Sequence, residues 1–98
     1  MTIEKNINAE SVTLKVSGRL DTQTAPELEK ELDISLPGTK ELVLDMTALD
    51  YVSSAGLRVI LKAQKVMNAQ GSMVLTGVNE SIMEVFEITG FLDILTIE

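Results

Sequence analysis

The sequence predicts a single α/β domain with a mixed, mostly parallel β-sheet. Segments with strand and helix patterns follow one another in the order β-β-α-β-α-β-α-β. Strands that alternate with helices form mostly parallel sheets through right-handed crossovers. The consecutive apolar residues Leu42, Val43 and Leu44 are typical of a central strand that is covered on both faces. A chain of 98 residues has room for one hydrophobic core, so we expect residues 1–98 to form one domain.

The first part of the chain predicts a β-hairpin followed by a helix. Residues 2–8 and 12–16 have strand patterns, and the short polar turn 9–11 joins them. The residues that follow the second strand lead to Thr24, Pro26 and Glu27, which have the spacing of a capping box. We therefore expect Thr24 to cap a helix whose buried face carries Ala25, Leu28 and Leu32.

The rest of the chain predicts three strands and two helices. Strands are expected at 41–46, 73–75 and 94–97, and a helix is expected from the two serines at 53 and 54 to about Ala69, ended by Gly71. Asn79 is placed to cap a third helix, which Gly90 ends. The buried residues expected on these two helices are Leu57, Ile60, Leu61, Ala63, Met67, Ile82, Val85 and Phe86.

Composition excludes several classes of function. The chain has no cysteine and no histidine, which rules out disulfides, Cys/His metal sites and a Ser-His triad. A net charge of −7 opposes binding to nucleic acid or to an anionic membrane. No glycine-rich phosphate loop is present, so we expect no bound nucleotide or other cofactor. The absence of a long apolar run and of a signal pattern favours a cytoplasmic protein, monomeric by default, without membrane insertion.

The most informative segment is the helix start around Ser53 and Ser54. A helix start has unpaired backbone N–H groups and a partial positive charge, so it favours a serine oxygen or a phosphate. Ser54 is therefore either the helix cap or a phosphorylation switch, and the two roles are compatible. Gly56 is expected to keep the first turn narrow and the serine hydroxyl open to a visiting protein.

Three segments resemble known proteins. Residues 51–57 (Tyr-Val-Ser-Ser-Ala-Gly-Leu), 18–21 (Gly-Arg-Leu-Asp) and 89–91 (Thr-Gly-Phe) resemble STAS domains, in particular bacterial anti-sigma factor antagonists. The resemblance covers essentially the whole chain. It implies the STAS fold, with helices chiefly on one face of the sheet and strands in the spatial order 1-3-2-4-5, numbered along the chain.

The resemblance also implies a regulatory function without enzymatic activity. In this family the unphosphorylated antagonist binds an anti-sigma factor that is also a serine kinase, and the sigma factor is released. Phosphorylation of one serine by that kinase, with ATP, ends the binding, and a serine phosphatase resets the switch. Aligned on Gly56 and Leu57, the acceptor is Ser54, and Asp21 matches an aspartate near it.

The chain departs from the family at two places. Many members have aspartate directly before the acceptor, where this chain has Ser53, so Ser53 is a second candidate acceptor. Many members also carry a final helix, which is missing or very short in this sequence. The residues expected to contact the partner are Asp21, Ser53, Ser54, Ala55, Gly56, Leu57, Arg58 and Lys62.

Three further interpretations remain open at the level of sequence. Arg58, Lys62 and Lys65 form either a solvated helix face or a face that steers an acidic partner. The domain as a whole is alternatively an assembly module of a lipid-transport complex or a signalling scaffold. A small α/β enzyme would need acid–base groups, for which Asp21 and Asp50 are the nearest candidates.

Overall fold

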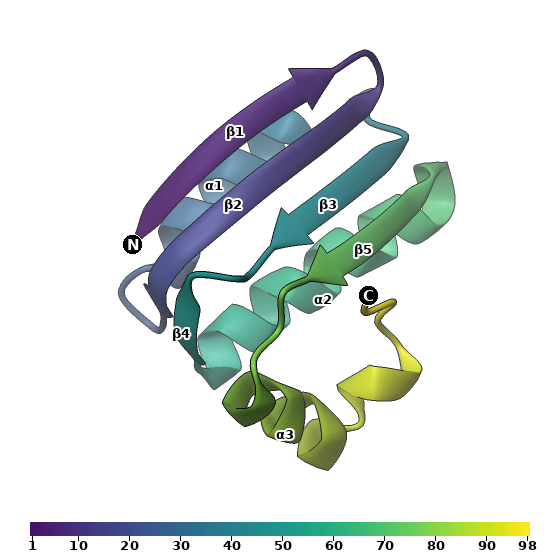
Figure 1. Cartoon of the computed structure of the whole chain (residues 1–98). Helices are drawn as coiled ribbons and strands as arrows, with labels where there is room; N and C mark the ends of the chain where they lie inside the picture. Colours follow the sequence, from purple (N-terminus) through teal and green to yellow (C-terminus); the bar gives the residue numbers. More distant parts are fainter.

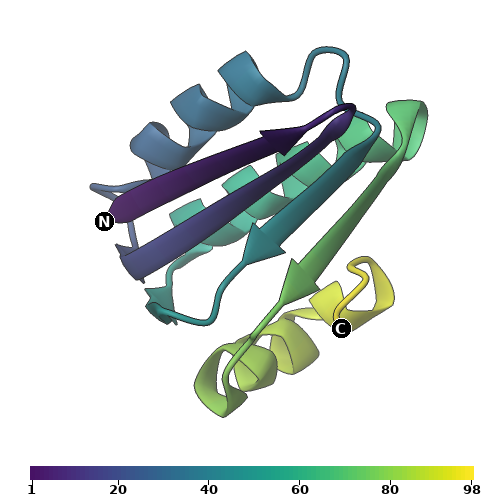
Figure 2. The ribbon, with the colours of Figure 1, turned by 45° about the horizontal axis from the view of Figure 1, so that its top comes forward.

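A computed structural model describes all 98 residues, and its strands form one sheet with two long helices on the same face (Figure 1). The turned view shows α1 and α2 side by side behind the strands, as predicted, while α3 lies beyond one end of the sheet (Figure 2). The elements, in chain order, are β1 Thr2–Asn8, β2 Ser11–Leu20, α1 Ala25–Ser35, β3 Glu41–Asp45, β4 Leu49–Val52, α2 Ser54–Gln70, β5 Ser72–Thr76, α3 Glu80–Thr89 and the 3-10 turn η1 Phe91–Asp93.

The sheet is organised around β2, which pairs with three other strands. It is antiparallel to β1, parallel to β3 over its first half and parallel to β4 at its end. The main path runs β1-β2-β3-β5, with β3 and β5 parallel. The predicted spatial order 1-3-2-4-5 is therefore wrong. The hairpin places β1 directly beside β2, so β3 takes the opposite edge of β2.

Strand β4 is absent from the sequence prediction. Its four residues do not alternate between buried and exposed, because Leu49 and Val52 are buried while the two residues between them are exposed. β4 forms because β2 continues to Leu20, four residues beyond its predicted end at Val16, and offers a free edge there. The pairing brings Leu20 opposite Val52, immediately before α2.

The predicted strand at 94–97 is also wrong. Gly90 adopts a left-handed φ of 80° and ends α3, and η1 follows directly. The rings of Phe86 and Phe91 stack across this turn with their centroids 6.3 Å apart. Beyond η1 the chain forms one isolated parallel bridge, between Ile97 and Leu75 of β5.

The hydrophobic core lies between the sheet and the helices. Alternate residues of β2, β3 and β5 point toward α1 and α2, as the strand periodicity requires. Leu61 is half-buried, although the sequence predicts full burial. No helix of the structure is both long enough and apolar enough to cross a membrane. The largest fully buried side chains are Phe86, Leu14, Leu20, Leu28, Leu42, Leu44, Met46, Leu49, Ile60, Met67, Met73 and Leu75.

Candidate functional site at the start of helix α2

Ser53 is the residue that caps α2. Its backbone is extended (φ −93°, ψ 175°), and its Oγ accepts a hydrogen bond of 3.3 Å from the backbone N–H of Gly56. This is the usual geometry of a serine N-cap, in which the side chain satisfies one N–H group that has no partner within the helix. Of the two serines, Ser53 is therefore the one that caps α2.

Ser54 is the first residue of the helix, and its side chain is exposed. Its hydroxyl makes no hydrogen bond to the rest of the chain. The capping hydrogen bond is made by the side chain of Ser53 instead. The interpretation of Ser54 as the N-cap is thus wrong. The hydroxyl of Ser54 is accessible at the end of the helix that favours negative charge.

The position of the helix start is fixed by its contact with the end of β2. The backbone N–H of Ser53 donates a hydrogen bond of 2.8 Å to the carbonyl of Leu20. Gly56 lies directly against the same residue, because a β-carbon at position 56 would be 2.7 Å from Leu20 Cγ and 3.0 Å from its carbonyl oxygen. Glycine is therefore required at position 56 because α2 packs closely on β2. The reason predicted from the sequence was a different one, namely that glycine keeps the first turn of the helix narrow.

Asp21, the residue after Leu20, forms a tight polar turn. Its Oδ1 accepts hydrogen bonds from the backbone N–H groups of Thr24 (3.1 Å) and Gln23 (3.0 Å). The bond from Thr24 is the main reason that the pKa of Asp21 lies below its usual value. The carboxylate is thereby held ionised in the turn between β2 and α1.

The predicted capping box at Thr24 is wrong, because the Thr24 side chain also takes part in this turn. The Thr24 hydroxyl donates to the carbonyl of Arg19 (2.6 Å) and accepts from the N–H of Asp21 (2.9 Å), so it points back into the turn. Thr24 occupies the cap position of α1 without a side-chain capping bond. The sequence Asp-x-x-Thr at 21–24 carried a signal for this turn, because aspartate bonds to nearby backbone N–H groups.

Arg19 and Tyr51 form a contact that the sequence did not reveal. The two residues face each other across the β2–β4 pairing, and the Arg19 guanidinium carbon lies 4.2 Å from the centre of the Tyr51 ring. Arg19 Nε also lies 3.7 Å from Asp21 Oδ2. No pattern signals this cluster, since it depends on the pairing of β4 with β2.

Arg58 lies one helical turn beyond Ser54 and is exposed. It lines a shallow depression between the first turns of α1 and α2, together with Thr22, Ala25, Pro26, Glu29, Ala55 and Val59. No carboxylate lies within ion-pair distance of Arg58, whereas Arg19 and Lys62 both have acidic partners.

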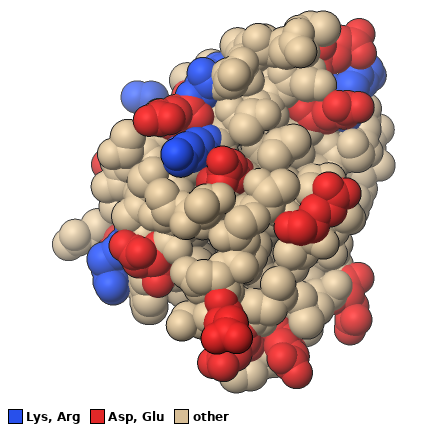
Figure 3. Space-filling model, viewed as in Figure 1, with Lys and Arg blue, Asp and Glu red and all other residues tan.

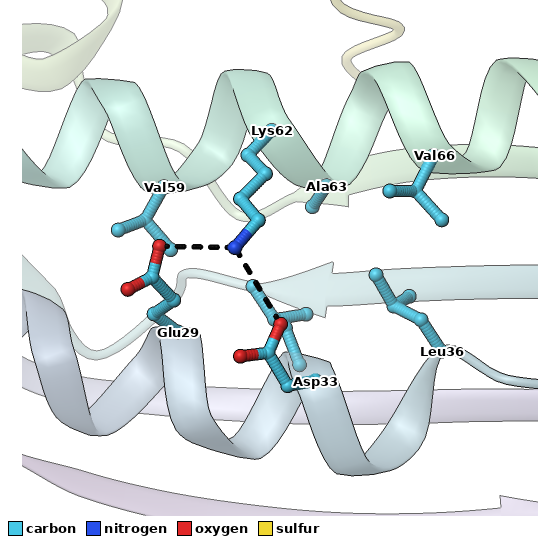
Figure 4. Close-up of a pocket in the computed structure, with 8 residues that line it drawn as sticks. Glu29, Asp33, Leu36, Val59, Lys62, Ala63 and Val66 are labelled. Atoms are coloured by element: carbon cyan, nitrogen blue, oxygen red, sulfur yellow. Dashed lines mark hydrogen bonds and ion pairs between the residues drawn. The ribbon is translucent and has the colours of Figure 1, made fainter.

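Lys62, a further turn along, points toward α1 (Figure 4). Its Nζ lies 3.2 Å from Glu29 Oε2 and 3.6 Å from Asp33 Oδ1. The hydrogen bond to Glu29 and the charge of Asp33 raise the pKa of Lys62. This lysine therefore joins α1 to α2, while Lys65 is exposed and has no ion-pair partner.

Acidic side chains gather at the α3 end of the molecule (Figure 3). Residues 80–98 contain five carboxylates and no lysine or arginine, so they carry −5 of the net charge of −7. No group of three or more acidic side chains is placed to hold a metal ion.

The structure brings most of the predicted site residues together at one end of the sheet. Ser53, Ser54, Ala55 and Arg58 lie at or near the surface at the start of α2, and Asp21 is held beside them by the Leu20 contact. Gly56 and Leu57 are buried and support the site from below. Lys62 is the one predicted residue that lies outside this group, in the contact with α1.

The sequence profile of the STAS domain family matches residues 2–98. Among curated proteins, the chain is 42% identical over 84 residues to a putative anti-sigma factor antagonist, BtrV, of Bordetella bronchiseptica, covering 84% of this chain and 72% of that protein. It is 33% identical over 98 residues to the anti-sigma-B factor antagonist of Staphylococcus aureus, covering 92% of this chain and 91% of that one.

A solved structure supports the same assignment of fold. A putative anti-sigma factor antagonist from Thermotoga maritima superposes with a TM-score of 0.90 at 22% identity, covering 97% of this chain and 84% of that one. Three sequence comparisons point to the same family as this structure. They are the family profile, which matches nearly every residue, and the two curated relatives. The chain is a STAS domain and belongs to the family of anti-sigma factor antagonists.

Proposed function

We propose that this protein is an anti-sigma factor antagonist that works as a phosphorylation switch. The unphosphorylated chain binds an anti-sigma factor and thereby releases a sigma factor for transcription. The anti-sigma factor is also a serine kinase, and its phosphorylation of Ser54 ends the binding. A serine phosphatase restores the binding form, and all steps take place in the cytoplasm. The names of the two curated relatives support the first step of this proposal.

The hydrogen bonds at the helix start favour Ser54 as the phosphorylated residue. Ser53 makes the capping hydrogen bond to Gly56, while the Ser54 hydroxyl is exposed and unbonded at the same helix start. Transfer of the γ-phosphoryl group of ATP forms a bond from Ser54 Oγ to phosphorus, breaks the bond to ADP and releases the hydroxyl proton to a base of the kinase. This transfer disturbs no hydrogen bond of the fold, whereas transfer to Ser53 would modify the oxygen that accepts the capping hydrogen bond from Gly56.

The phosphate acts at the interface and leaves the fold intact. It adds about −1.5 to −2 charge at pH 7. The start of a helix offsets part of that charge, by roughly 0.3–1 kcal/mol for an anion. A like charge placed against it by a docked partner costs several kcal/mol, and each 1.4 kcal/mol is about a tenfold change in affinity. Phosphorylation can therefore change partner binding by orders of magnitude without unfolding the chain.

We further propose that the chain is a substrate and not itself a catalyst. The Asp21 carboxylate accepts hydrogen bonds from two backbone N–H groups and lies beside Arg19, which keeps it ionised. Such a group is a poor proton donor near neutral pH. Asp50, the other carboxylate considered for acid–base chemistry, is exposed on β4.

Mapping of the phosphorylation site by mass spectrometry tests the proposal. The chain is incubated with ATP and a purified anti-sigma factor of the serine-kinase class, and the modified residue is identified by fragmentation. We expect one phosphate, on Ser54, in the wild-type chain and in Ser53→Ala, and none in Ser54→Ala. A phosphate on Ser53, or none on the wild-type chain, would overturn the assignment. Capture of a transporter subunit in place of an ATP-dependent kinase would favour an assembly module.

A further inference from the structure

We infer that Arg58 is an internal partner for the phosphate on Ser54, and that phosphorylation withdraws this arginine from the docking surface. The inference rests on the proposed phosphorylation of Ser54. It is based on the positions of Ser54 and Arg58 on one helix and on the absence of any bonding partner for either side chain.

The spacing of the two residues permits the contact. Ser54 and Arg58 are four residues apart in the same helix, and such side chains are neighbours on one face, with Cβ atoms about 5–6 Å apart. An acidic group that precedes a basic group by four residues is the more favourable order of such a pair. Arginine also presents a planar fork of N–H donors that matches two phosphate oxygens at once.

The other charged groups near the helix start are already engaged. Arg19 lies beside Asp21 and over the Tyr51 ring. Lys62 is paired with Glu29 and Asp33. Glu29 lines the same depression as Arg58, but its Oε2 is directed to Lys62. Arg58 is thus the cation within one turn of Ser54 that is exposed and has no acidic partner.

This arrangement gives the phosphate two effects. In the unmodified chain the Arg58 guanidinium is free at the edge of the site, where it can meet an acidic group of the partner. In the phosphorylated chain the same guanidinium binds the phosphate. The partner then meets an added negative charge and also loses a positive one. Because the pair lies within one helix, it forms without any change of fold.

A phosphorus NMR titration of the phosphate tests the inference. The chain is prepared with phosphoserine incorporated at position 54 during synthesis, so the result does not depend on whether any kinase uses this residue. The second pKa of the phosphate, ordinarily about 6, is read from its chemical shift for the parent protein and for Arg58→Gln. We expect the phosphate pKa to be about 0.3 lower with arginine present, the shift that corresponds to an exposed pair at this spacing.

Lys65→Gln is the matched control. It removes the same charge from an exposed, unpaired position of the same helix. Position 65 lies about 16 Å from Ser54 along the helix axis, beyond the screening length at physiological salt. We expect its phosphate pKa to equal that of the parent, and we expect Arg58→Lys to give an intermediate value. Equal pKa values for the parent and Arg58→Gln would overturn the inference. So would an equal shift in Lys65→Gln, which would mark a general effect of net charge. Circular dichroism checks that each variant is folded.

Discussion

Gly56 packs directly on Leu20, so the first turn of α2 approaches the end of β2 more closely than a side chain would allow. A β-carbon at position 56 would lie 2.7 Å from Leu20 Cγ. Gly56→Ala should therefore destabilise the protein by up to about 2 kcal/mol, because an overpacking cost of about 1–3 kcal/mol outweighs the roughly 1 kcal/mol that alanine gains over glycine in a helix. Urea unfolding measures the difference.

A double-mutant cycle identifies the cause of that loss. Leu20→Ala removes the side-chain atoms Cγ and Cδ2 that the new β-carbon would meet and leaves only the carbonyl oxygen, so Gly56→Ala should cost less in that background. An unchanged cost would mean that the tight contact with Leu20 is not what requires glycine at this position.

The same substitution at two glutamines of α2 should change the free energy of unfolding in opposite directions. Gln64 is buried. Its Nε2 donates a hydrogen bond of 2.8 Å to Asn68 Oδ1, which a methionine would lose, but its Oε1 has no hydrogen-bond partner. An unpaired buried polar atom costs about 1–3 kcal/mol, so Gln64→Met should raise the free energy of unfolding by roughly 0.5–1 kcal/mol.

Gln70 is the matched control on the same helix. Its Nε2 donates to the carbonyls of Leu36 (2.6 Å) and Thr39 (2.8 Å), which ties the end of α2 to the segment after α1. Gln70→Met should lower the free energy of unfolding by about 1–2 kcal/mol. Thermal or urea unfolding of both variants makes the comparison, and a loss of stability in Gln64→Met would contradict this assignment.

The turn at Asp21 should make stability depend on pH in the acid range. Its folded pKa is lowered below 3.8, chiefly by the hydrogen bond from the Thr24 N–H, so the unfolded chain binds the proton more tightly. The contribution of this carboxylate is therefore fully present above pH 3.8 and is lost as pH falls through the folded pKa.

Asp21→Asn should accordingly be less stable than the wild type at pH 7, and the difference should shrink as the pH is lowered below 3.8. Urea unfolding at a series of pH values measures it. Asp50→Asn serves as the control, since Asp50 is an exposed carboxylate of β4 that makes none of the hydrogen bonds of this turn. A difference between wild type and Asp21→Asn that stays constant down to pH 2 would exclude the proposed role of the carboxylate.

Charge on α2 should affect the rate at which the partner binds. If Lys62 steers an acidic partner, Lys62→Glu should slow association more at low salt than at high salt, because exposed charges are screened by ions. The ion pairs of Lys62 with Glu29 and Asp33 predict a smaller effect than that of Arg58→Glu, whose guanidinium is unpaired. Stopped-flow association rates with the anti-sigma factor decide this, and rates independent of salt would remove the steering role from both residues.

The sequence predicted those parts of the fold that depend on local signals. Asn79 accepts a hydrogen bond of 2.9 Å from the N–H of Ile82 and caps α3, and Gly90 ends that helix in the left-handed conformation. Gly71 ends α2, as predicted. In each case a polar cap or a glycine acts within a few residues of itself, so no knowledge of the tertiary fold is required.

The errors concern features that tertiary contacts decide. β4 forms because β2 offers it an edge, and its own residues show no strand periodicity. Ser53 and Ser54 are equally good caps by residue type. The hydrogen bond from the Ser53 N–H to Leu20 selects Ser53 and leaves Ser54 free. The sequence therefore indicated that both serines lie at the start of α2, but it did not indicate which of them caps the helix.

The affinity of the anti-sigma factor for two variants of Ser54 tests the central claim most directly. Ser54→Ala removes the acceptor hydroxyl without adding charge, and Ser54→Asp places a negative charge at the same exposed position. Isothermal titration calorimetry should give an affinity close to wild type for Ser54→Ala and a loss of at least about tenfold, or 1.4 kcal/mol, for Ser54→Asp. Equal affinities of the two variants would contradict a switch that operates through charge on Ser54.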